Sequence, residues 1–154
     1  MNRRIGAGIA SLALAGTIVG GAAVSAFADP LSSTEFKKQA NEICAQGNQQ
    51  IEATAQQVFG NLPQGQEPSA DQLQAFAAAA IPNIKQQIEA VAALEAPKSL
   101  RAKVKKAISS ARKAVTKVEA DPSLLADEKH DPFAGTNKQL KKIGLKECAG
   151  DSSS

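Results

Sequence analysis

The stretch "LRAKVKKAISSARKAVTKVE", residues 100–119, decides the fold. Its apolar residues recur three or four positions apart and fall within an arc of about 120° when each residue advances 100°. The rest of the circumference is basic, with no acidic residue before Glu119. This pattern predicts an amphipathic helix that buries one face. The apolar residues are Leu100, Val104, Ala107, Ile108, Ala111, Val115 and Val118.

An earlier stretch has the same period and begins with a capping box. Ser32 is followed three residues later by Glu35, so each side chain can bond to a free backbone N–H of the other residue. Gly60 and Pro63 are expected to end this helix. Its apolar stripe consists of Phe36, Ala40, Ile43, Cys44, Ile51, Ala55, Val58 and Phe59, with Gly47 on the same side.

A second stripe follows the turn-rich loop "NLPQGQEP" and opens with a capping box of Ser69 and Gln72. Pro82 interrupts it, at a cost of about 3 kcal/mol in a helix interior. We therefore expect a kink, or two helices of about 70–81 and 83–95. The stripe consists of Leu73, Phe76, Ala77, Ala80, Ile84, Ile88, Val91 and Leu94.

The C-terminal region repeats the same signals on a shorter scale. Asp121 and Pro122 can start a short helix, and Asp131 with Pro132 is expected to cap and open the last one. Gly144 is expected to end it, and the following Leu145 to pack against it. The residues expected to face inward are Phe133, Leu140 and Ile143.

No sustained alternation of β-branched and polar residues predicts a strand. Four amphipathic helical segments joined by short loops pack most simply as an antiparallel bundle, so we predict an all-α fold. The bundle domain is expected to span residues 29–149, followed by a disordered polar tail at 150–154.

The first 28 residues, "MNRRIGAGIASLALAGTIVGGAAVSAFA", have a basic start, a long apolar run and a small-residue ending. This layout is typical of a secretory signal peptide cleaved between Ala28 and Asp29. The Arg3-Arg4 pair raises the Tat export route, whereas Gly6, in a position that usually holds a bulky apolar residue, favours Sec. The alternative is a retained anchor helix.

Composition excludes several classes of function. Removal of Arg3 and Arg4 with the signal leaves 16 of the 18 basic residues and all 15 acidic ones. The net charge is then close to zero, which gives no general attraction to nucleic acid or membranes. Trp and Tyr are absent, so platforms for stacking bases or sugars are scarce. We also find no nucleophile elbow, phosphate-binding glycine loop or metal-ligand spacing. An enzyme is therefore not expected, and neither is a cofactor.

The chain has only two cysteines, Cys44 and Cys148. An exported protein with two cysteines usually pairs them, and an antiparallel bundle returns its last helix towards the first. A metal site would have two thiols and the single His130, and a redox centre would favour closely spaced cysteines. The sequence favours a structural disulfide over both.

Three stretches resemble a group of actinobacterial secreted proteins and lipoproteins. They are "FKKQANEICAQGNQQI" (36–51), "PNIKQQIEAVAALEAP" (82–97) and "DPFAGTNKQLKKIGLKEC" (131–148). The resemblance implies a small disulfide-linked helical domain at the cell surface, and it implies no activity and no catalytic residues. Unlike the lipoprotein members, this chain has no lipidation cysteine after the apolar run.

Two clusters of charged residues are candidate sites. The turn "DEKHD" (127–131) could hold a divalent cation or a general base, but capping by Asp131 explains it more simply. The second cluster is a basic patch on the helix at 100–119, which could dock on an anionic partner or could be an ordinary solvated face. The patch consists of Lys105, Lys106, Arg112 and Lys113.

Charge is distributed unevenly along the chain. Residues 29–95 contain 3 basic and 8 acidic residues, and the chain from residue 96 onward contains 13 and 7. The expected function is that of a secreted, non-catalytic interaction module of the cell envelope, with an anionic polymer or another envelope protein as partner. No nucleic-acid partner, bound metal or stable membrane insertion after signal cleavage is expected. The alternative is a carrier of a small apolar ligand held between the helices.

We predict that the exported protein begins at Asp29, because cleavage after Ala28 removes the whole basic and apolar segment. Intact-mass measurement of protein recovered from the extracytoplasmic fraction tests this directly. A mass that includes residues 1–28 would instead identify the segment as a retained anchor.

Overall fold

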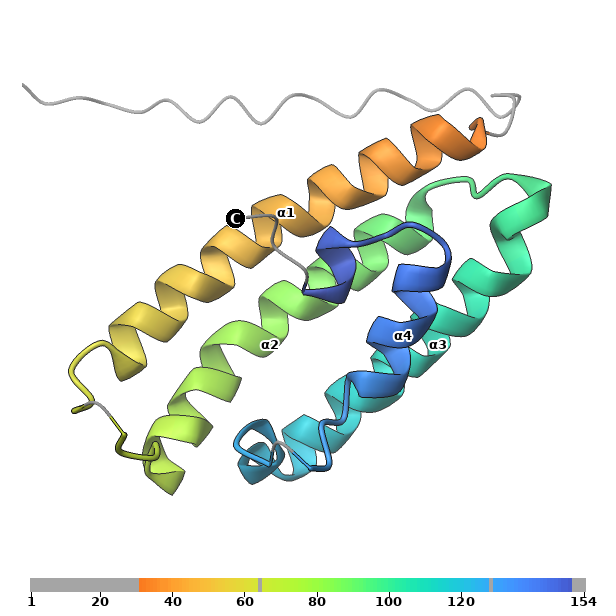
Figure 1. Ribbon diagram of the computed structural model, residues 1–154. Helices are drawn as coiled ribbons and strands as arrows, with labels where there is room; N and C mark the ends of the chain where they lie inside the picture. Colours follow the sequence, from red (N-terminus) through yellow and green to blue (C-terminus); the bar gives the residue numbers. More distant parts are fainter. Residues whose placement is uncertain (1–30, 64, 128, 151–154) are drawn as a thin grey trace, which may run out of the picture.

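The computed structural model describes residues 31–63, 65–127 and 129–150 (Figure 1). The predicted signal peptide lies outside the described residues, as do residues 151–154 of the predicted tail. No described residue lies in a β-strand, so the predicted all-α class is confirmed. The elements are α1 (Ser33–Phe59), α2 (Ala70–Ala93), α3 (Lys98–Ala120), the 3₁₀ helix η1 (Pro122–Leu125), α4 (Ala134–Lys142) and the 3₁₀ helix η2 (Glu147–Ala149).

The three long helices α1, α2 and α3 lie side by side with α2 in the middle, and consecutive helices run antiparallel (Figure 1). The shorter α4 packs against α3, and η2 then bridges α4 and α1. The short helix η1 contacts both α2 and α3. The described residues therefore form a bundle of four helices in which the fourth is much shorter than the others.

The helix starts that the sequence predicts are present. At α1, the N–H of Glu35 donates to Ser32 Oγ at 3.2 Å and the N–H of Ser32 donates to Glu35 Oε2 at 3.1 Å. Ser69 and Gln72 form the same reciprocal pair at α2. These bonds satisfy backbone donors that have no partner within the helix. Both capping boxes are confirmed.

Helix α2 is continuous through Pro82, so the predicted division into helices of about 70–81 and 83–95 is wrong. Proline has no N–H to donate to the carbonyl of Ala78, one turn earlier. Both residues are exposed, and water can therefore bond to that carbonyl. Buried side chains on either side of the proline, among them Ile81, pack into the core and hold the two halves in one helix.

Helix α4 begins at Ala134, so the predicted roles of Asp131 as its cap and Pro132 as its first residue are wrong. The N–H of Phe133 donates to Asp131 Oδ1 at 2.7 Å, and the N–H of Ala134 donates to the backbone oxygen of Asp131 at 3.2 Å. These bonds close a separate turn ahead of the helix. Asp131 therefore stabilises this turn rather than the first turn of α4.

The end of α4 follows the prediction. Gly144 has a φ of +82°, a conformation that glycine adopts without steric cost. Its N–H donates to the carbonyl of Lys141 at 3.1 Å, and the N–H of Leu145 donates to that of Leu140 at 3.0 Å. This pair of bonds is a Schellman motif. It reverses the chain, and Leu145 becomes completely buried.

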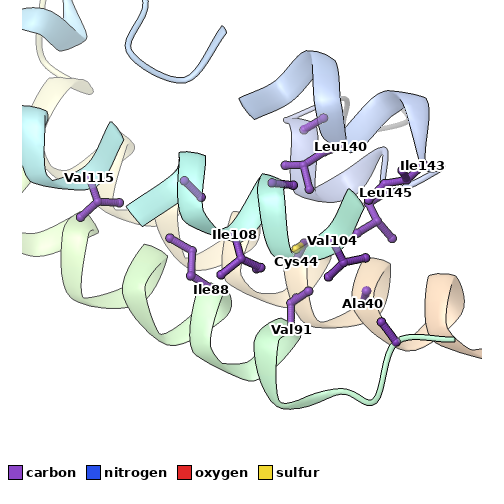
Figure 2. Packing of buried hydrophobic residues seen from close by; sticks show 14 of the residues in the cluster. Ala40, Cys44, Ile88, Val91, Val104, Ile108, Val115, Leu140, Ile143 and Leu145 are labelled. Atoms are coloured by element: carbon purple, nitrogen blue, oxygen red, sulfur yellow. The ribbon is translucent and has the colours of Figure 1, made fainter. Parts of the chain in front are cut away.

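Aliphatic side chains from all four helices form the core (Figure 2). On α2 and α3 the buried residues belong to the predicted stripes, apart from Ile81 and Ala114, which add to them. On α1 the predicted stripe is buried only between Phe36 and Gly47. Phe36 and Leu145 are the largest side chains with no exposed surface. The core residues near the first half of α1 and the end of the chain are Phe36, Ala40, Cys44, Val91, Val104, Ile108, Leu140, Ile143 and Leu145.

We predict that Leu145→Ala lowers the free energy of unfolding by about 3 kcal/mol, because it leaves a cavity in the core. Leu62→Ala is the control, since Leu62 is only half-buried and lies outside the core cluster, and about 1 kcal/mol or less is expected. Urea denaturation followed by circular dichroism gives both values. Equal losses would contradict the placement of Leu145.

Candidate functional site

The predicted disulfide is present and joins the middle of the first helix to the end of the fold. Cys44 lies three turns into α1 and Cys148 lies in η2. Their sulfur atoms are 2.02 Å apart and their Cα atoms 4.9 Å apart, across 104 positions of sequence. Cys44 is buried near Val104 and Ile108 (Figure 2). Both thiols are therefore used, and neither is available as a metal ligand or a nucleophile.

Two asparagines of α1 hold the returning chain on either side of the disulfide. Asn41 Nδ2 donates to the carbonyl of Gly144 at 3.1 Å, and its Oδ1 accepts from the N–H of Glu147 at 3.2 Å. Asn48 Nδ2 donates to the carbonyl of Glu147 at 2.8 Å. These bonds provide hydrogen-bond partners for backbone groups of residues 144–147, which lie outside any regular α-helix.

Asn41 and Asn48 do not belong to the apolar stripe that the sequence predicts for this helix, yet both are half-buried. Their spacing from Cys44 could have predicted this burial. Asn41 stands three residues before Cys44 and Asn48 four residues after it, and residues at these distances share one side of a helix. A cysteine that bonds to the chain's end brings that end within reach of both side chains.

A small apolar cavity lies beside the disulfide. Its walls come from all four helices and η2, and they include Ile88, Ala111 and Leu140, with Phe133 from the turn before α4. The cavity volume is about 80 Å³, which is below the 150 Å³ of a cavity that accepts benzene and far below pockets for drug-sized ligands. The alternative function, a carrier of a small apolar ligand, stays a prediction.

The four residues of the predicted basic patch differ in their surroundings. Arg112 is engaged, since its Nε and Nη2 donate to the two carboxylate oxygens of Glu89 at 3.0 and 2.8 Å. Lys105 lines the groove between α2 and α3 together with Arg112 and Glu95. Lys106 and Lys113 are exposed and lie seven residues apart on the outer side of α3. The role of these four residues as one binding patch stays a prediction.

Helix α4 adds further lysines to the surface on which Lys106 and Lys113 lie. Gln139 Nε2 donates to Ser110 Oγ at 3.3 Å, which sets the register of the antiparallel α3 and α4. Lys142 then lies at about the level of Lys106, on the outer side of the seam. We call this surface the basic face; it consists of Lys103, Lys106, Lys113, Lys117, Lys138 and Lys142. All six lysines are exposed, and none forms an ion pair within the described residues.

Asp127 of the "DEKHD" turn binds the backbone of its own turn. Asp127 Oδ1 accepts from the N–H groups of Lys129 and His130, and Asp127 Oδ2 lies 2.8 Å from His130 Nδ1. The hydrogen bond from His130 holds the pKa of Asp127 below its usual value. No group of three His, Cys, Asp or Glu residues that could hold a metal ion occurs in the part of the chain that the structure describes.

Comparison with known proteins adds no relative: no family model matches the chain, and neither the curated proteins nor the solved structures contain a match. The resemblance to actinobacterial surface proteins therefore stays a prediction. Among the described residues, no helix has the length and apolar character needed to cross a bilayer.

We predict that the Cys44→Ala/Cys148→Ala double variant loses about 3–5 kcal/mol of unfolding free energy, because opening a loop of about 100 residues frees the unfolded chain. Urea denaturation of this variant and of the oxidised protein measures the loss. The double variant is preferred to a single one because it leaves no unpaired thiol. A denaturation midpoint that does not change would show that the disulfide contributes nothing to stability.

Proposed function

We propose that the protein is a non-catalytic binding module of the cell envelope or the extracellular space, and that its basic face binds an anionic envelope polymer. The observation that carries this proposal is the basic face itself. Six exposed lysines from two packed helices lie there without ion pairs among the described residues. The predicted signal peptide and the disulfide support an oxidising compartment outside the cytoplasm.

The chemistry of the face favours a polymer over insertion into a lipid bilayer. The residues between the lysines on the outer side of α3 are small, namely Ala102 and Ser109. No aromatic or large aliphatic side chain accompanies them, so the face offers charge without an apolar anchor. A polymer with repeated phosphate or carboxylate groups can contact several lysines at once, and each contact adds to the affinity.

Rigid placement supports the same function. The disulfide and the bonds of Asn41 and Asn48 fix the end of the chain to α1, and α4 packs between this end and α3. The lysines of α4 are therefore held in register with those of α3. A preformed surface loses less conformational entropy when it binds than a mobile tail does.

Replacement of Lys106, Lys113 and Lys142 by Gln is expected to weaken binding to polyglycerol phosphate on the order of 100-fold at low salt, since each lysine contributes about 1 kcal/mol. Isothermal titration calorimetry measures the affinity, and the slope of affinity against salt should fall as well.

The matched control replaces Lys38, Lys85 and Lys129 by Gln, which removes the same charge from other surfaces. Little change is expected, because these lysines lie outside the basic face. Equal losses for the two triple variants would show that net charge alone is responsible. Unchanged binding of the first variant would refute the proposed site.

A further inference from the structure

The second half of α1 has an apolar stripe that the fold leaves partly uncovered. The buried residues of α1 all lie between Phe36 and Gly47. The stripe continues through Ile51, Ala55 and Phe59, but these side chains are only half-buried and none belongs to the core cluster. The reason is the length of the last helix. In Figure 1, η2 lies against the first half of α1, and neither η2 nor α4, which packs on α3, reaches the second half of α1.

An open groove lies at this end of the bundle. Phe59 and Phe76 form its aromatic floor, with ring centroids 5.1 Å apart, and Leu73 and Leu125 extend it. The loop at 65–68 forms one wall, and the segment from Leu125 to Asp127, with Lys129, forms the other. The volume of the groove is about 900 Å³. We call this site the aromatic groove.

The shape of the aromatic groove suits a helix better than a small molecule. At the covered end of the bundle, α4 lies over the same layer of helices and buries Leu140 and Ile143. The aromatic groove is the corresponding place without a helix, and it is open to solvent. A small apolar ligand would remain half-exposed there, whereas an amphipathic helix would bury its apolar stripe and keep its polar side in water.

The charge of the residues around the groove indicates which kind of helix would bind there. The chain has no Lys or Arg between Lys38 and Lys85, although that interval contains four acidic residues. Of the described residues that line the groove, Glu67 and Asp127 are acidic and Lys129 is basic. The surroundings are therefore acidic on balance. Two copies of this end would bring the same acidic residues together, which disfavours a symmetric dimer through this surface.

We propose that the aromatic groove binds a basic amphipathic helix of a partner protein, whose apolar residues pack on Phe59 and Phe76 and whose Lys or Arg side chains lie near Glu67. This inference concerns a second surface, which does not include the lysines of the basic face. It therefore neither requires polymer binding nor is required by it.

The test uses an 18-residue fluorescein-labelled peptide of Leu and Lys in a helical pattern, and a second peptide with Glu in place of Lys. Fluorescence anisotropy is expected to show saturable binding of the Lys peptide and at least tenfold weaker binding of the Glu peptide. Phe76→Ala should weaken binding of the Lys peptide at least tenfold, with circular dichroism and thermal unfolding used to confirm that the variant is folded.

Glu67→Lys supplies a second variant in an exposed loop, where a change of fold is not expected. It should weaken binding of the Lys peptide at least fivefold. Glu42→Lys is its control, because it makes the same change of charge on an exposed part of α1 near the covered end. Binding of polyglycerol phosphate is expected to persist in Phe76→Ala, which separates failure at this groove from failure at the basic face.

Three results would overturn the proposal. One is equal affinity for the Lys and Glu peptides, which would leave an apolar surface without charge selection. Another is an equal effect of Glu67→Lys and Glu42→Lys, which would indicate attraction to the whole acidic half. The third is a dimer in sedimentation velocity that Phe76→Ala dissociates, since the occupant would then be a second copy of the chain.

Discussion

The structure depends on one covalent constraint, the bond between Cys44 and Cys148. Helix α4 has nine residues, and an isolated helix of that length is not stable in water. Its stability comes from contacts with α3, from the Schellman turn that buries Leu145, and from the attachment of the following residues to α1. The hydrogen bonds of Asn41 and Asn48 set the angle at which the chain returns. The covalent bond keeps these weaker contacts together.

The short last helix also divides the molecule into two ends. Where α4 and η2 lie over the long helices, the interior is filled with aliphatic side chains. Where they do not reach, the same stripes leave Phe59 and Phe76 partly exposed. The basic face and the aromatic groove thus have a common origin, since α4 supplies lysines to the first and its limited length leaves the second open.

Local features could be predicted from the sequence, because neighbouring residues determine them. The capping boxes at Ser32 and Ser69, the glycine end at Gly144 and the face of α3 follow from spacing alone. Contacts between helices depend on register, which spacing does not give. The pairing of Arg112 with Glu89 and the bonds of Asn41 were missed for this reason. At Pro82, tertiary packing outweighed a local preference for a break.

The disulfide also determines how the protein responds to tension. A pull on the C-terminus passes from Cys148 directly to Cys44, in the middle of α1, and does not peel α4 from the bundle. The residues between the two cysteines form a closed loop that cannot be extended while the bond is intact. Only the chain before Cys44 and after Cys148 can lengthen. A partner that pulls the C-terminus away from the N-terminus therefore loads α1 only as far as Cys44, and the rest of α1, with α2, α3 and α4, is mechanically shielded.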